Sequence, residues 1–417
     1  MNRLLNKKIT LFDIGVFLAF LLVIKPQYFA EADIAASVEA LYYYGKIAVL
    51  AVAFTWFVLR CLVGHKLSTT FIFACVLYIW YAISAAVNGL DWLESLTDHL
   101  SIVIMLLLFE CAEERLPEML SVLRVVLELM ALINLATILM FPSGMYSVQI
   151  ENSIEYRTEC WFFGYRNNHL WMILPTVMLS GICDCLKKGR YSFRFFLVLV
   201  VAIATCFLIG SATASIAILL TAMVCVIFSY LTLKETYKHI NVYIPLLALL
   251  LVSVFLVVLG NVSALAPLAE LFGRASDFSG RTDIWNAAIK MVTEAPIVGY
   301  GTSYFYVTST LLTSHPHNQI LYILLMGGVV ALLIWTVLFV LMNHALTAYE
   351  NPFAKMLFVA VISGYACAAV AESFTYFSML IPIVLLAVLL VPYFAMGQNV
   401  SSESKDVSGR KVMREIL

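Results

Sequence analysis

A succession of long apolar segments, separated by short polar ones, constrains this chain more than any other feature. Twelve such segments can be read, at 9–25, 40–59, 69–87, 99–112, 119–141, 168–184, 195–210, 212–232, 242–260, 318–341, 356–371 and 378–396. A helix needs about 20 mainly apolar residues to cross a bilayer. Because 63% of the 417 residues are hydrophobic and 12% charged, little sequence remains for a soluble domain. We therefore predict an all-α polytopic membrane protein with about twelve transmembrane helices, as one domain over 1–397 and a polar tail at 398–417.

The distribution of basic residues predicts how the chain is oriented. An even number of spans places the basic N-terminus and the basic tail on the same side, together with 18 of the 25 Lys and Arg residues. Five lie in loops on the other side (Arg157, Arg166, Arg274, Arg281 and Lys290), and Lys25 and Lys46 lie at outer span ends. Cytoplasmic loops carry such an excess of basic residues, so both termini are expected in the cytoplasm. The net charge of −1 gives no indication of a nucleic-acid partner.

Two long loops, 142–167 and 261–317, lie on the outer side of this layout, so we expect the function there. In the second loop, Trp285, Ala288, Ile289 and Val292 follow the spacing of one helix face. This pattern predicts an amphipathic helix at the membrane interface. Arg281 would lie in its first turn, where it and the positive helix end favour an anion.

The same loop ends in His315 and His317, directly before a span. An imidazole at the outer mouth of a span can take a proton near neutral pH, which makes His317 a candidate general base. Two other interpretations stay open: solvated histidines without a role, and a zinc site. The zinc interpretation is weak, because two histidines two residues apart supply neither the usual spacing nor the remaining ligands.

Several further polar residues at outer positions have two interpretations each. Arg166, and less strongly Arg157, either pairs with an acid of the same loop (Glu151, Glu155 or Glu159) or binds phosphate oxygens through its planar fork. Glu372, at the outer end of a span, is a base, a partner for an arginine, or only solvated. The segment 210–215 between two spans is either a tight turn of small residues or a broken helix that lines a cavity.

The stretch 280–331 resembles the O-antigen ligase and polymerase family of bacterial envelope glycan enzymes. The matching residues are Gly280-Arg281-Thr282-x-Ile284-Trp285, then Ala295-Pro296-Ile297-Val298-Gly299-Tyr300-Gly301, then His317-Asn318-Gln319-Ile320-Leu321 and Gly327-Gly328. The resemblance implies a GT-C-like glycosyltransferase fold in the bacterial cytoplasmic membrane. It also implies undecaprenyl-diphosphate-linked glycans as substrates, used without a metal or other cofactor.

The resemblance maps the family's catalytic histidine onto His317 and its outer-loop arginine onto Arg281. Many members carry a further arginine in a Ser/Thr-rich segment that opens a middle span, but 210–215 contains none. Arg166 is our candidate for the missing diphosphate contact. His315, Asn318, Asp283, Arg157 and Glu372 are expected to support the site, and Asp277 or Asp283 could serve as base if His317 does not.

The chemistry of glycosyl transfer suits this set of residues. A lipid diphosphate is already a stabilised leaving group, so the site must deprotonate an acceptor hydroxyl and neutralise the growing diphosphate charge. The favoured hypothesis is a polymerase of O-antigen or capsule repeat units, which would work with a flippase and a chain-length regulator. The alternatives are an O-antigen ligase, which transfers glycan to lipid A core or another acceptor, and a lipid-glycan transporter.

Overall fold

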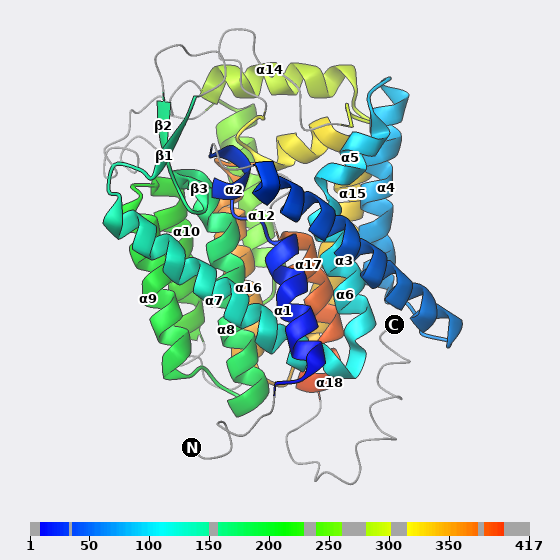
Figure 1. The fold of residues 1–417 in the computed structure, drawn as a ribbon. Helices are drawn as coiled ribbons and strands as arrows, with labels where there is room; N and C mark the ends of the chain where they lie inside the picture. The colour runs from blue at the N-terminus through cyan, green and yellow to red at the C-terminus, as the bar shows by residue number, and fades with distance from the viewer. Residues whose placement is uncertain are drawn as a thin grey trace.

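Helices occupy each of the twelve apolar segments that the sequence predicts (Figure 1). The computed structural model describes residues 9–32, 36–149, 157–228, 239–260, 281–301, 315–373 and 379–395, so the predicted tail at 398–417 lies outside the described residues. The helices of the bundle are α1 (Leu11–Val23), α3 (Ala36–Leu62), α4 (Thr69–Val87), α6 (Leu100–Ala112), α7 (Leu116–Met140), α8 (His169–Lys188), α9 (Phe193–Leu208), α10 (Ala212–Met223), α12 (Tyr243–Ser253), α15 (Gln319–Thr347), α16 (Pro352–Ala369) and α17 (Leu380–Leu389).

Shorter elements connect or extend these helices. They are α2 (Tyr28–Glu31), α5 (Trp92–Asp98), α14 (Arg281–Glu294), α18 (Val391–Phe394), the 3₁₀ turns Glu113–Arg115 and Arg166–Asn168, and the π-helical turns Val224–Phe228 and Val254–Val258 that prolong α10 and α12.

The described helices fit a membrane protein by length and composition. Six stretches are long and apolar enough to cross a bilayer: Ala36–Leu62, Thr69–Val87, Leu100–Met140, Arg166–Lys188, Gln319–Thr347 and Pro352–Ala369. The stretch Leu100–Met140 contains both α6 and α7. Five shorter apolar helices lie at Leu11–Val23, Phe193–Leu208, Ala212–Ile227, Tyr243–Val258 and Leu380–Leu389. The predicted class, a mostly helical membrane protein, is therefore confirmed.

A small antiparallel sheet lies within the first long loop, where the sequence predicts only a loop. Its order is β1 (Tyr146–Gln149), β2 (Arg157–Trp161) and β3 (Gly164–Tyr165), with Tyr146 opposite Cys160. The turn between β2 and β3 is tied to α7, because Asn134 Oδ1 accepts a hydrogen bond of 2.9 Å from Phe163 N. The sheet thus fixes the start of α8, which follows β3 after a single 3₁₀ turn.

A glycine-containing segment, 296–301, packs into a break in α15 and so fixes α14, which precedes it. The break is at Gly328, whose φ of 63° and ψ of −162° are not helical. Three backbone hydrogen bonds of 2.6, 2.8 and 2.9 Å join the segment to α15 around this break. Gly301, with φ of 76°, lies so close to α4 that an added Cβ would meet the backbone nitrogen of Ala85 at 1.9 Å. Only glycine satisfies both the backbone angle and the space.

The two ends of the bundle carry different groups. α14 and the sheet lie at one end, whereas the start of α1 and α18 lie at the other (Figure 1). Ion pairs between helices gather toward the end with α18: Arg60 with Glu113, Arg124 with Asp184, and Arg194 with Glu128. Arg124 is only 6% exposed, and its pair with Asp184 joins α7 to α8. A buried charge is tolerated when it is paired and hydrogen-bonded, as here.

We expect Gly301→Ala to destabilise the protein. Holding a residue other than glycine in this backbone region costs about 1 to 3 kcal/mol, and the overlap with α4 adds to that cost. A clear fall in the melting temperature of the detergent-purified protein would report it. Gly15→Ala in α1 is the matched control, because a Cβ there meets nothing within 4 Å and alanine favours a helix. Equal melting temperatures for the two variants would contradict the close packing at Gly301.

Candidate active site

The carboxylate of Glu372 joins three segments that are far apart in the sequence. It lies just after α16 and is 5% exposed. Oε1 accepts hydrogen bonds from Arg281 Nη2 at 3.0 Å and from Asn167 Nδ2 at 2.9 Å. Oε2 lies 3.4 Å from His317 Nδ1. The structure thus brings together both principal candidates of the sequence analysis, with Glu372 between them.

Glu372 is ionised at neutral pH. Burial alone would raise the pKa of its carboxyl, but the Arg281 guanidinium and the hydrogen bond and charge of His317 outweigh burial and lower this pKa to about 2. Of the interpretations left open for Glu372, a partner for an arginine is the one that the structure favours.

Arg281 is the first residue of α14, as the sequence predicts for the first turn of an interfacial helix. The helix is amphipathic: Ile284, Trp285 and Ala288 are buried on one face. One terminal nitrogen of Arg281 binds Glu372, and the side chain is 17% exposed. Because a guanidinium has five N–H donors in a fixed fork, the donors not directed at Glu372 can bind an anion.

His317 has an uncommon backbone conformation, with φ of 49°. Residues other than glycine that are held in this region are frequent at functional sites. Since Glu372 is ionised and can only accept, the hydrogen of the imidazole is assigned to Nδ1. In the neutral imidazole, Nε2 then carries the lone pair that a general base requires.

Asn318 fixes the backbone next to His317. Its Oδ1 accepts hydrogen bonds from Ile320 N and Leu321 N and so caps α15. Its Nδ2 donates to Ser253 Oγ and to the carbonyl of Val370, each at 3.1 Å. Asn318 therefore joins α12, α15 and the end of α16.

His315 packs against His317 from within the protein. Their ring centroids are 4.2 Å apart in an edge-to-face arrangement. Burial, assisted by the nearby charges of His317 and Arg281, lowers the pKa of His315 to about 3, so its imidazole is neutral at physiological pH. A neutral ring there restricts the orientation of His317 without adding charge to the site.

Asn167 and Ser211 belong to the same hydrogen-bond network, and the sequence analysis gave neither a role. Asn167 donates to Glu372, and its Oδ1 accepts a hydrogen bond of 3.0 Å from Ser211 Oγ. Ser211 also caps α10 after the turn at Gly210, whose φ is 65°. The segment 210–215 is therefore a tight turn followed by a helix, the first of its two interpretations.

The remaining predicted residues lie outside this network. Arg166 donates from Nε to its neighbour Tyr165 at 3.1 Å and forms no ion pair with a described residue, so pairing with Glu159 is not found. Arg157 begins β2, but its side chain lies outside the described residues, as do Glu151, Glu155 and Asp277. Asp283 is exposed on α14 and is in no described contact with His317 or Glu372.

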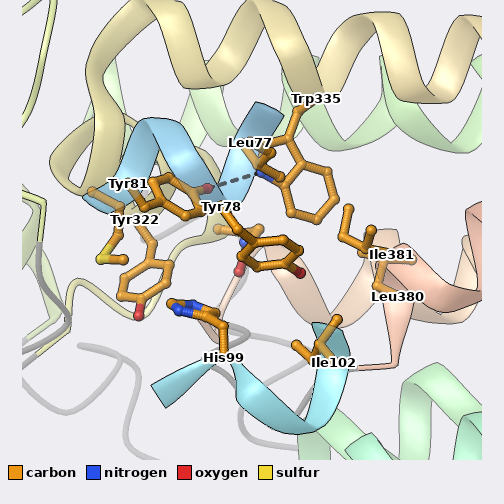
Figure 2. Close-up of a pocket in the computed structure, with 11 residues that line it drawn as sticks. Leu77, Tyr78, Tyr81, His99, Ile102, Tyr322, Trp335, Leu380 and Ile381 are labelled. Atoms are coloured by element: carbon orange, nitrogen blue, oxygen red, sulfur yellow. Dashed lines mark hydrogen bonds between the residues drawn. The ribbon is translucent and has the colours of Figure 1, made fainter. Parts of the chain in front are cut away.

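A small aromatic pocket begins two residues beyond His317 (Figure 2). Its lining comes from α4, α15, α17 and the junction of α5 with α6: Leu77, Tyr78, Tyr81, His99, Ile102, Gln319, Tyr322, Met326, Trp335, Leu380 and Ile381. Trp335 Nε1 donates to Tyr81 Oη at 3.0 Å, and His99 stacks on the Tyr81 ring. The pocket thus lies beside the N-terminal half of α15, which follows His317 in the chain.

One comparison with known proteins identifies a related family. Residues 197–336 match the family model described as O-antigen ligase, which confirms the resemblance noted for 280–331. The match includes Ser211, Arg281 and His317, whereas Asn167 and Glu372 lie outside it. No curated protein shows significant sequence similarity to the chain.

We expect Glu372→Gln to destabilise the site by roughly 1.5 to 3 kcal/mol, the range for a charge-assisted hydrogen bond. The pKa of the Glu372 carboxyl is lowered from 4.5 to about 2 in the folded state. Its contribution to the free energy of unfolding is therefore complete above pH 4.5 and is lost as the pH falls toward 2. The melting temperatures of the wild type and the variant should thus differ more at pH 7 than at pH 3. Glu39→Gln, at an exposed position of α3, is the control. A difference that does not depend on pH would refute this account.

Proposed function

We propose that the chain is a membrane glycosyltransferase that polymerises undecaprenyl-diphosphate-linked oligosaccharide repeat units of a bacterial surface polysaccharide, on the outer face of the cytoplasmic membrane. The observation that carries the proposal is the pairing of Arg281 and His317 with one buried carboxylate, Glu372. The O-antigen ligase match supports a role in polysaccharide assembly and covers both residues.

In the proposed reaction His317 Nε2 removes the proton from an acceptor hydroxyl. The oxygen attacks the anomeric carbon of the donor glycan, a new glycosidic bond forms, and the bond from that carbon to the diphosphate oxygen breaks. Undecaprenyl diphosphate leaves with the electron pair, and the donors of Arg281 that are not directed at Glu372 stabilise its charge. Glu372 accepts from Nδ1–H and stabilises the imidazolium that forms.

Arg166 is proposed as the second arginine for the diphosphate. It has no acidic partner among the described residues, and the next residue, Asn167, binds Glu372. The loop that carries Arg166 is therefore attached to the site. The guanidinium groups of Arg281 and Arg166 would then neutralise the two negative charges, roughly, that a diphosphate diester carries.

The proposal includes a topology. All twelve apolar segments cross the membrane, both termini are cytoplasmic, and the architecture is GT-C-like. It is supported by the distribution of basic residues, since 18 of the 25 Lys and Arg residues lie on the predicted cytoplasmic side. A flippase that delivers the lipid-linked unit and a chain-length regulator are the expected partners.

A ligase is the alternative that a specific finding favours, since O-antigen ligase is the description of the matched family. The same base and arginines would serve a ligase, with lipid A core or another molecule as acceptor. The short stretch between Trp285 and His317 resembles that of polymerases more than that of ligases, which is why a polymerase is the first choice. A transporter is less well supported, because transport sites place ionisable residues near the bilayer midplane, whereas this cluster lies at helix ends.

Deletion of the gene separates the two enzymes. A polymerase is expected to leave single repeat units attached to the acceptor and to remove the long chains, whereas loss of a ligase removes the glycan from the acceptor altogether. Electrophoresis of the surface glycan of the deletion strain, with and without the wild-type gene supplied in trans, distinguishes these results. An unchanged glycan profile would exclude both activities.

His317→Ala should reduce transfer by roughly 100- to 10,000-fold, the range for a positioned general base. The variant should still insert in the membrane, because Asn318 retains the cap of α15. The quantity to measure is the amount of polymer formed by equal amounts of membrane-inserted protein in the deletion strain. His344→Ala is the control, since His344 is exposed at the other end of the same helix. Polymer at the control level would remove His317 from the mechanism.

Arg281→Lys keeps the positive charge but loses the planar fork, so donor turnover should fall substantially. For Arg166→Ala we expect donor affinity to fall roughly 10- to 150-fold, while the melting temperature changes little. Both quantities can be measured on the purified variants. Full turnover in Arg281→Lys would show that charge alone is sufficient. If Arg166→Ala lowers the melting temperature and leaves donor affinity unchanged, Arg166 only supports the loop.

A further inference from the structure

Two lysines that form no ion pair with a described residue lie near the same aromatic ring, Tyr42, beside the candidate active site. Lys25 follows α1, and its Nζ is 5.8 Å from the centre of the Tyr42 ring. Tyr42 and Lys46 are four residues apart on α3 and thus share a face of that helix. Lys25 and Lys46 are therefore both neighbours of the Tyr42 ring. Both side chains are half-buried, so two like charges are held together where water only partly screens them.

No described carboxylate compensates these charges. Neither lysine forms an ion pair with a residue that the structure describes, and Glu39, on the same helix, is exposed and contacts neither. Two neighbouring ammonium groups repel each other, and a bound anion would remove that repulsion. A lysine binds phosphate as a point charge, without the geometric demands of arginine.

The aromatic rings near the pair are of the kind that is typical of the membrane interface. Tyr28, Phe29, Tyr42, Tyr146 and Phe162 form a chain of ring contacts around it, with centroids 5.4 to 5.9 Å apart. Tyrosines are enriched at the membrane interface, where lipid phosphates lie. An anion bound between the lysines would therefore be the phosphate of a lipid, with its acyl or prenyl chain alongside the apolar faces of α1 and α3.

The lysine pair is linked to the active site by one loop. Gln27, two residues after Lys25, accepts a hydrogen bond of 2.6 Å from Asn168 Nδ2. The neighbouring Asn167 binds Glu372. A ligand on the lysines would thus lie across the loop 164–168 from His317, near the base but not in contact with it.

We propose that Lys25 and Lys46 bind the diphosphate of the acceptor lipid-linked glycan. This inference rests on the proposed polymerase function, in which two lipid-linked glycans must be bound at once. The donor reacts at the carbon attached to its diphosphate, next to Arg281. The acceptor reacts through a hydroxyl at the far end of its repeat unit, so its diphosphate must lie away from His317. About two negative charges of a diphosphate match two ammonium groups, whereas an ordinary phospholipid phosphodiester carries about one.

The first test counts binding sites for undecaprenyl diphosphate on the full-length protein in phosphatidylcholine nanodiscs. The wild type should bind two equivalents. Lys25→Gln with Lys46→Gln should weaken one of them roughly 10-fold or more, the loss expected when a charge-assisted contact is removed. Lys25→Arg with Lys46→Arg should retain both equivalents. The control is Lys66→Gln with Lys290→Gln, which removes the same charge at exposed positions. Equal binding by the glutamine variant and the wild type would overturn the proposal.

Two further experiments identify the ligand and distinguish a failure of this inference from a failure of the proposed function. If phosphatidylglycerol in the nanodiscs abolishes the lysine-dependent equivalent, the pair is a general headgroup site and the assignment to the acceptor is wrong. In a transfer assay, the glutamine variant should raise the half-saturating acceptor concentration about 10-fold and leave that of the donor unchanged. An unchanged acceptor requirement overturns the assignment. Absence of transfer in the wild type overturns the polymerase function and with it the acceptor role, while the binding count still reports whether the lysines bind a lipid diphosphate.

Discussion

A carboxylate that is buried at the end of a membrane helix must be neutralised by partners, because its desolvation is otherwise too costly. Glu372 meets this requirement with three donors from separate parts of the chain, Asn167, Arg281 and His317. Each partner is fixed in turn by its own neighbours: Asn167 by Ser211, Arg281 by the buried face of α14, and His317 by Asn318 and His315. The geometry of the site is thus a consequence of satisfying one buried charge.

The helices could be predicted from the sequence because hydrophobicity is a local property, and each apolar run is helical in the structure. The sheet could not, since strands of four, five and two residues are too short to show a period of two. Arg281 and His317 were identifiable because each stands at the start of a helix, a position that the sequence displays. The role of Glu372 stayed open between three interpretations, because its partners are 55, 91 and 205 positions away in the sequence. The contribution of Asn167 depends wholly on such distant contacts and gave no signal of its own.

The glycines of 296–301 and the break at Gly328 have a role in the site although none of them touches it. They fix the C-terminal side of α14 against α4 and α15, while the Arg281–Glu372 pair fixes its N-terminal side. A helix held at both ends presents its guanidinium with little freedom, which favours the oriented contacts that a diphosphate requires. This explains in physical terms why glycines distant from any ligand accompany the arginine and histidine in the sequence pattern.

The position of Glu372 in the chain also determines when its network of contacts can form during synthesis. Membrane proteins are synthesised and inserted from the N-terminus, at about 5 to 20 residues per second. The segments that carry Arg281 and His317 are therefore synthesised before the carboxylate of Glu372. Until α16 has been delivered, the guanidinium lacks its counter-charge and the imidazole has no fixed tautomer. The hydrogen-bond network around Glu372 is therefore complete only after residue 372 has been synthesised, and a chain that ends before this residue lacks the carboxylate that joins the three segments.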